Sequence, residues 1–321
     1  MMVEKLSDNT EGLYTADYFE KKTGTKNGYT NYLSSPVANL IGKYGFTRLF
    51  STQPGNHLDL GCADGSLMEI FRSSGFSSSG LEISKDAVLV AKSKGLSVSQ
   101  SNLHAFPATL GELDVITAFD LLEHSDSPGL VLRGIYEHLK DGGYFVFSTL
   151  SVKRNDPSEY WFNNSLEHYI YYNKRSLNYI LTDVFGKNSF AFVEIEVNGV
   201  AEFWGVAKKG NIEVEREILN SIKSGTFDKK DPESGYFVSL FYNQLSKFTE
   251  SQQVITHFAD TWSDEYLMLA TFYNAFYQGK YEYALDTVDK SLHYVSAGDQ
   301  VYWQALSFVR QQYFDIRKKD I

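Results

Sequence analysis

The stretch His57-Leu58-Asp59-Leu60-Gly61-Cys62-Ala63-Asp64-Gly65-Ser66-Leu67 decides the fold of this chain. Its apolar start, its small residues at positions 61, 63 and 65 and the helical pattern that follows predict a buried strand, a tight turn and a helix. Small residues let a ligand lie against the backbone, and the free N–H groups of a helix start favour an anionic group. The spacing G-x-A-x-G differs from the G-x-G-x-x-G of dinucleotide-binding proteins.

An acidic residue ends the next predicted strand. Glu82 lies in Ser79-Gly80-Leu81-Glu82-Ile83-Ser84, about 20 residues beyond the glycine turn, where nucleoside-binding α/β units place a carboxylate on the ribose hydroxyls. A surface glutamate at a strand end is the alternative interpretation.

Two further motifs follow in order, one over 114–124 and one over 140–149. Together, D-L-G-C-A-D-G, G-L-E-I-S, D-V-I-T-A-F-D-L-L-E-H and L-K-D-G-G-Y-F-V-F-S-T resemble the class I S-adenosylmethionine-dependent methyltransferases. The branch with ubiquinone-type and sugar O-methyltransferases is the most similar. The resemblance runs from roughly Tyr14 to Lys209. The chain departs from the family at Ala63, which replaces the middle glycine of the loop and is small enough to keep binding.

The resemblance implies a site for S-adenosylmethionine as cofactor. The methionyl part would be held by Asp59, Gly61, Cys62, Ala63, Asp64 and Gly65, the ribose by Glu82 beside Ile83, and the adenine by Asn102 and Leu103. Asp120 and Leu121 would close over the cofactor. Alternatively, Asn102 is a turn residue with no contact to the adenine, and both interpretations stay open.

Strands and helices alternate between 57 and 150, which predicts a parallel sheet with helices on both faces. Asn198-Gly199 predicts a hairpin between two later strands, and the resemblance implies a Rossmann-like seven-stranded sheet that ends in this antiparallel pair. The helix expected over 35–50 is amphipathic and is predicted to pack on the sheet.

From Asn211 onward helical patterns replace strands. Gly279–Leu285 is similar to the second half of a tetratricopeptide repeat, which predicts a small all-α domain with a repeat-like hairpin. We therefore expect an α/β chain of three parts: an N-terminal helical and aromatic lid segment over 1–56, the cofactor-binding core over 57–210, and an α-helical domain over 211–321.

The segment 151–173 follows a predicted strand and is rich in aromatic and amide side chains, as substrate loops are. Candidate substrate contacts are Tyr18, Tyr29, Arg154, Trp161 and Asn164. Docking of the N-terminal aromatics and an aromatic mini-core under the loop are the structural alternatives. A hydroxyl acceptor must lose a proton, so a histidine base is expected. His168 is the first candidate, and His124 is the second, with a structural role near the cofactor as its alternative.

Composition narrows the class of protein. The 321 residues carry a net charge of −10, which disfavours nucleic acid as main partner. Because Cys62 is the one cysteine, the chain has no internal disulfide. We expect Cys62 to occupy its place in the loop because it is small and not as a nucleophile. A polar N-terminus and no membrane-length apolar run predict a cytoplasmic protein. No cluster of metal-ligating residues stands out in the sequence, so no metal is expected.

The sequence thus predicts an O-methyltransferase that acts on a hydroxyl of a small molecule or saccharide. One alternative is methylation of an aromatic or quinone-like ring hydroxyl. A second is a non-catalytic scaffold that works through its helical domain, which could also mediate homo-oligomerisation or contact a protein partner.

Overall fold

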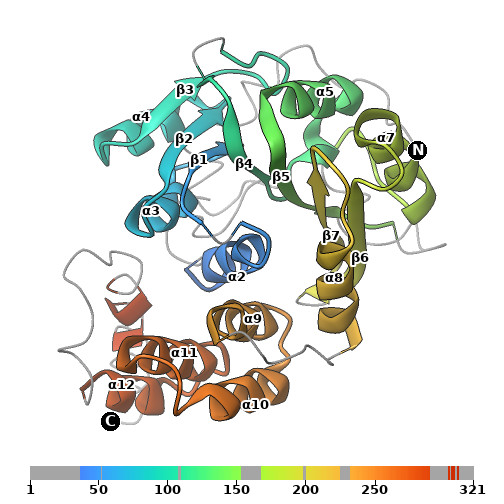
Figure 1. Cartoon of the computed structure of the whole chain (residues 1–321). Helices are drawn as coiled ribbons and strands as arrows, with labels where there is room; N and C mark the ends of the chain where they lie inside the picture. Colours follow the sequence, from blue (N-terminus) through green and yellow to red (C-terminus); the bar gives the residue numbers. More distant parts are fainter. Residues whose placement is uncertain are drawn as a thin grey trace. The chain divides into compact units, whose positions relative to one another are not determined.

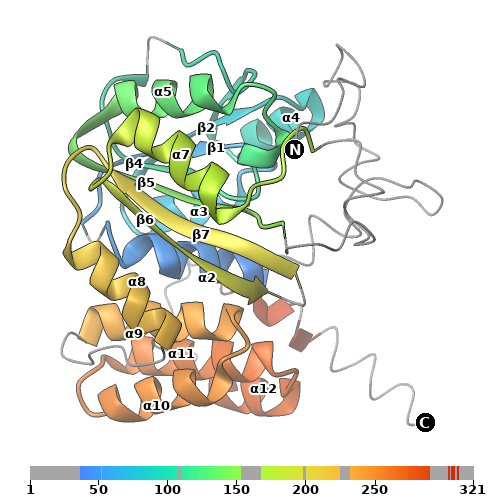
Figure 2. The ribbon, with the colours of Figure 1, turned by 90° about the vertical axis from the view of Figure 1, so that its right-hand side faces the viewer.

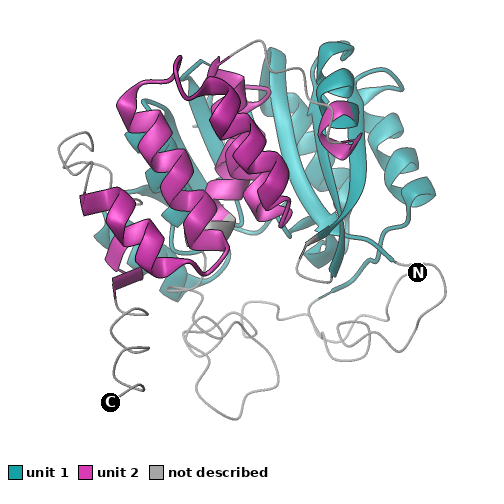
Figure 3. Cartoon of the chain, turned by 90° about the horizontal axis from the view of Figure 1, so that it is seen from below, with its two compact units in different colours: residues 1–35, 53–220 teal, residues 36–52, 221–321 magenta. Residues whose placement is uncertain are grey.

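The computed structural model describes residues 37–51, 53–107, 110–152, 168–197, 200–224, 232–289, 303, 305–307, 309 and 310. These residues belong to two compact units (Figure 3), which differ from the three predicted parts. The first unit holds the described residues between 53 and 220, and the second holds those of 36–52 together with those after 220.

The first unit is built on a seven-stranded sheet of order β3-β2-β1-β4-β5-β7-β6 (Figure 1). Its strands are β1 (Asn56–Leu60), β2 (Ser77–Glu82), β3 (Ser97–Gln100), β4 (Leu113–Ala118), β5 (Leu139–Leu150), β6 (Phe190–Val197) and β7 (Val200–Lys208). β1 to β5 pair in parallel, whereas β7 pairs antiparallel with both β5 and β6. The predicted Rossmann-like sheet and its terminal antiparallel pair are confirmed. The Asn198-Gly199 turn lies outside the described residues.

Helices cover both faces of this sheet. They are α3 (Ser66–Ser73), α4 (Lys85–Ser93), the 3-10 turn η3 (Leu122–His124), α5 (Pro128–His138) and α7 (Lys174–Phe185). Because side chains alternate along β1, Leu58 and Leu60 join the core under α5 and α7, while His57 stacks on Phe71 of α3 on the other face. α5 and α7 lie side by side in Figures 1 and 2.

β5 contains an irregularity. The Asp141-Gly142-Gly143 segment lies inside the strand. Gly142 has φ 81°, and the register with β4 shifts between Leu113 and Val115. A left-handed glycine lets one strand carry an irregularity of this kind while both of its ends stay paired.

The second unit is helical. It contains α2 (Val37–Arg48), α9 (Pro232–Gln244), α10 (Phe248–Phe258), α11 (Asp264–Tyr277) and α12 (Tyr281–Asp289). α8 (Val214–Ser224) spans the boundary between the units. A tetratricopeptide-like repeat is not confirmed, although α11 and α12 do pack on each other.

α2 packs on α9, a partner that the sequence analysis did not predict. Gly42 and Gly45 make this close approach possible: a Cβ atom on Gly45 would lie 2.9 Å from the Phe237 carbonyl oxygen. Arg48 adds an ion pair to Glu233, with 3.2 Å between Nη2 and Oε1. Amphipathic periodicity predicted the helix but not its partner, which lies far along the chain.

No helix among the described residues is long and apolar enough to span a lipid bilayer.

Candidate functional site

The loop after β1 has an unusual backbone. Gly61, Ala63 and Gly65 all lie in the left-handed region, with φ of 69°, 48° and 78°. For alanine this conformation costs about 1–2 kcal/mol, so surrounding contacts must hold it. The Ala63 N–H donates to Oε2 of Glu82 at 2.9 Å. The acid that ends β2 therefore fixes the loop that follows β1.

Glu82 is buried, with 6% of its surface exposed. Its other oxygen, Oε1, accepts the Ser84 N–H at 2.8 Å. Burial raises the pKa of the Glu82 carboxyl, and the hydrogen bonds from Ser84 and Ala63 partly oppose that rise. A carboxylate oxygen accepts more than one hydrogen bond, so the bracing of the loop is compatible with the predicted ribose contact.

The two longer side chains of the loop turn toward α4. Cys62 packs in an apolar cluster with Val88 and Ala91 of α4, and burial, followed by nearby carboxylates, raises the pKa of its thiol. The Asp64 carboxylate pairs with Lys94, with 2.7 Å between Oδ2 and Nζ. Cys62 is thus a small packing residue, and the loop is left with bare backbone and the Ala63 methyl on its other side.

A buried hydrogen-bond relay runs below the loop. The Thr117 hydroxyl donates to Asp59 Oδ1 at 2.7 Å, so its oxygen accepts from His57 Nε2, which is 2.9 Å away. That assignment leaves His57 Nδ1 as the acceptor of the Ser78 hydroxyl, at 2.8 Å. Burial lowers the pKa of His57 to about 3, which keeps the ring neutral. The relay orients the Asp59 carboxylate, and sequence analysis had left His57 without a role.

The predicted adenine contacts lie beyond β2 and β3. Asn102 is exposed, and its Oδ1 accepts the His104 N–H at 3.1 Å, as in the turn that was the alternative interpretation. Leu103 packs at the border of the core. The carbonyl oxygen of Ile83 accepts from Gln100 Nε2 at 3.3 Å.

Asp120 and Leu121 follow β4 and face the loop. Asp120 has φ 54°, and the Ser148 hydroxyl donates to its Oδ1 at 2.6 Å. Leu121 lies against Gly61, where an added Cβ atom would come within 2.6 Å of the leucine Cδ1. Leu121 therefore covers Gly61, and the closing of Asp120-Leu121 over the cofactor stays a prediction.

The two candidate bases lie together. The rings of His124 and His168 are 4.7 Å apart between centroids and nearly perpendicular. Burial, and then the neighbouring His124, lowers the pKa of His168 to about 3. Its Nδ1 is buried and has no hydrogen-bond partner among the described residues.

Glu123 completes this group. It is 1% exposed, accepts the Thr149 hydroxyl at 2.6 Å, and has a pKa of about 8 because of burial and the nearby Asp120 charge. The ligating atoms of Glu123, His124 and His168 lie within 4.8 Å of one another, so the three could hold a metal ion. This cluster was not identified from the sequence. Sequence spacing could not reveal it, since His168 is far along the chain from the other two.

Five predicted substrate residues, Tyr18, Tyr29, Arg154, Trp161 and Asn164, lie outside the described residues. Residues 1–36 of the lid segment and most of the 151–173 loop do so as well. Of the loop, residues 151, 152 and 168–173 are described, and Tyr171 brings its ring to 5.6 Å from that of His168.

Comparison with known proteins gives the site a context. Residues 34–184 match a family described as a methyltransferase domain. Over 101 residues the chain is 36% identical to a ubiquinone biosynthesis O-methyltransferase of Thiobacillus denitrificans. This aligned stretch covers 29% of this chain and 44% of that protein. The same-named protein of Burkholderia cenocepacia is 35% identical with the same two coverages. The chain thus spans less than half the length of these relatives.

A solved magnesium protoporphyrin IX methyltransferase from Synechocystis superposes with a TM-score of 0.47 at 15% identity, over 63% of this chain and 96% of that one.

Proposed function

We propose, on the premise that residues 34–184 of this chain form a methyltransferase domain, that the protein transfers a methyl group from S-adenosylmethionine to a hydroxyl group. The observation that carries the proposal is the loop of left-handed backbone at 61, 63 and 65, braced by the buried Glu82. Backbone without side chains allows the close approach that such a cofactor needs.

The residues present fit this cofactor. Glu82 would accept the ribose hydroxyls with the lone pairs that Ala63 and Ser84 leave free. Asp59, oriented by Thr117, would receive the ammonium group of the methionyl part, and the start of α3 would face its carboxylate. Leu121 would shield the loop from water. The cofactor supplies a methyl group on a positively charged sulfur. The chain therefore contributes mainly by orienting the two reactants and by excluding water from them.

We assign the removal of the acceptor hydroxyl's proton to the pair of His124 and His168. The His168 ring is neutral at physiological pH, and we assign it the tautomer in which the unpartnered Nδ1 carries the lone pair. In its buried setting it is a weak base, so it would assist a hydroxyl that ionises readily. His124 packs against it and would orient the ring.

This weak base bears on the class of acceptor. A phenol loses its proton far more readily than a sugar hydroxyl, and Tyr171 adds an aromatic wall beside His168. The names of the two relatives point the same way. We therefore rank a phenolic or quinone-like ring hydroxyl above the saccharide that the amide-rich 151–173 segment suggested.

The first test is calorimetry with S-adenosylmethionine and S-adenosylhomocysteine, for which we expect saturable one-to-one binding. Turnover is then measured on matched panels of catechols, monophenols and sugars. Methylation of phenols alone is the expected result. Turnover of sugars alone would reverse the ranking, and binding of neither cofactor form would overturn the proposal in favour of a scaffold.

A further inference from the structure

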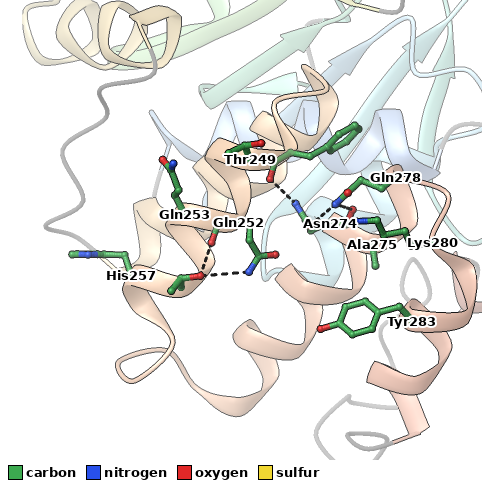
Figure 4. Close-up of a pocket in the computed structure, with 11 residues that line it drawn as sticks. Thr249, Gln252, Gln253, His257, Asn274, Ala275, Gln278, Lys280 and Tyr283 are labelled. Carbon is green, nitrogen blue, oxygen red and sulfur yellow. Dashed lines mark hydrogen bonds between the residues drawn. The ribbon is translucent and has the colours of Figure 1, made fainter.

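The helical unit contains an open groove of about 640 Å³, a size typical of ligand sites. One side of the groove is α10, and the other is formed by the end of α11 and the start of α12 (Figure 4). None of the residues of the methyltransferase site lines it.

The α10 side is a continuous stripe along one face of the helix. It consists of Phe248, Thr249, Gln252, Gln253, Thr256 and His257. The opposite face of α10 is buried through Val254 and Ile255. A solvent-facing helix usually alternates Lys and Glu on its polar face, yet Glu250 is the one Asp, Glu, Lys or Arg in α10. Amides and hydroxyls, which both donate and accept hydrogen bonds, take the place of charges.

Some of these groups are already committed and others are not. The Thr256 hydroxyl donates to the Gln252 carbonyl at 2.9 Å, and Gln278 Nε2 donates to Asn274 Oδ1 at 2.7 Å. The exposed Gln253 amide has no side-chain hydrogen bond to any described residue. Gln252 Nε2 is also committed, because it donates to the Thr256 hydroxyl oxygen at 3.5 Å. The Gln253 amide therefore remains for a ligand near the middle of the stripe.

The spacing of the stripe matches a peptide backbone. Positions 249, 253 and 257, like 252 and 256, recur every four residues, which is about 6 Å along a helix. Two residues of an extended chain advance about 6.6 Å. Thr249 and Gln253 can thus each meet one dipeptide of an extended segment laid along the groove.

The charge of the groove is positive. Lys280 lines the side opposite α10 (Figure 4), together with Tyr283. No described carboxylate pairs with the Lys280 ammonium group, and no described lining residue is acidic. This absence matters in a chain of 40 acidic and 30 basic residues, because an acid-free groove with a lysine favours an anionic ligand.

We propose that this groove binds an extended peptide segment that bears a carboxylate, with the α10 stripe on the peptide backbone and Lys280 on the carboxylate. The segment belongs to a partner protein. The site is independent of methyl transfer, and the helical unit thereby serves as a docking module for the enzyme's partner.

The test uses the full chain and two synthetic libraries of N-acetylated hexapeptides, one with a free C-terminal carboxylate and one amidated. Peptides retained by the chain are identified by mass spectrometry, and their Kd values are measured by fluorescence anisotropy. We expect selected peptides to bind with micromolar Kd. Retention from the free-acid library alone would assign the carboxylate to the peptide terminus, and retention from both libraries would assign it to Asp or Glu side chains.

Lys280→Glu and the pair Gln252→Ala with Gln253→Ala are each expected to raise the Kd at least tenfold. Lys223→Glu, at an exposed lysine of α8 outside the groove, is the matched control and should stay within twofold. Circular dichroism and S-adenosylhomocysteine binding should be unchanged in all variants. The proposal is overturned if neither library yields a peptide, or if Lys280→Glu binds the selected peptides as well as the natural chain does.

Discussion

At the scale of single residues, the site depends on hydrogen-bond direction more than on charge. His57 can complete the relay to Asp59 in one tautomer only, with Nε2 protonated, because the Thr117 hydroxyl donates its proton to the carboxylate. A neutral, buried histidine thus acts on the cofactor site as a fixed dipole. Its contribution is the orientation of Asp59 and not proton transfer.

Thr117→Val removes the hydroxyl that links His57 to Asp59 at almost constant volume. We expect the Kd for S-adenosylhomocysteine to rise about tenfold, the cost of a lost hydrogen bond to a charged acceptor. Thr117→Ser, which keeps the hydroxyl, should recover most of the affinity. Calorimetry measures both variants, and equal affinities of the valine and serine proteins would rule out the relay.

Glu82→Ala leaves the Ala63 and Ser84 N–H groups without their acceptor. We predict a loss of cofactor affinity of at least tenfold and a lower unfolding free energy, by about 1–3 kcal/mol for the buried unpaired donors. Calorimetry and urea unfolding give the two values. Glu137→Ala, at an exposed glutamate of α5, is the control. Cofactor affinity within twofold of the natural chain would remove Glu82 from the ribose role.

At the scale of elements, the loop after β1 and the segment after β4 are fitted to each other. Gly61 is required twice, by its left-handed φ and by the Leu121 side chain that lies on it. The two elements come from strands that are neighbours in the sheet. The parallel register therefore brings the loop and its cover together.

Gly61→Ala should lower the unfolding free energy by more than 1 kcal/mol, since alanine is strained at positive φ and its Cβ atom meets Leu121. Combining it with Leu121→Ala should return part of that loss, because the collision is removed while the strain remains. Thermal unfolding of the two single variants and the double variant measures this coupling. Strict additivity would mean that Leu121 does not cover Gly61.

How far the sequence predicts these elements depends on the range of the contacts. Periodicity predicted the alternation of strands and helices over 57–150 and the helical region after Asn211, because periodicity reflects local burial. The grouping of Glu123 and His124 with His168 was missed, as was the pairing of α2 with α9. Both the histidine group and the helix pairing join segments that are far apart in the sequence, and a local sequence pattern does not predict such contacts.

At the scale of the whole molecule, two buried groups make stability depend on pH in opposite directions. His57 has a pKa of about 3 in the fold, against 6.5 when unfolded. Below pH 6.5 His57 binds a proton in the unfolded chain but stays neutral in the folded chain. The unfolding free energy therefore falls as the pH drops toward 3. Glu123 has a pKa of about 8 against 4.5, so the folded chain keeps a proton that the unfolded chain releases, and stability falls as pH rises from 4.5 to 8.

His57→Gln should reduce the slope of unfolding free energy against pH below pH 6.5, by up to about 1.4 kcal/mol per pH unit. Glu123→Gln should reduce the opposite slope between pH 4.5 and 8 by up to the same amount. Urea unfolding between pH 4 and pH 9 measures both slopes, with His138→Gln on α5 as the control. Unchanged slopes in the His57 and Glu123 variants would mean that other groups set the pH dependence.

The pairing of α2 with α9 also orders events during synthesis. α2 leaves the ribosome early, and its partner is made only after the entire β-sheet unit has been translated. At 5–20 residues per second, the delay is roughly ten to forty seconds. For that time the nascent chain carries a helix with buried-type residues such as Tyr44 and Phe46 and no partner helix. α2 can therefore complete its packing on α9 only after the β-sheet unit has been synthesised.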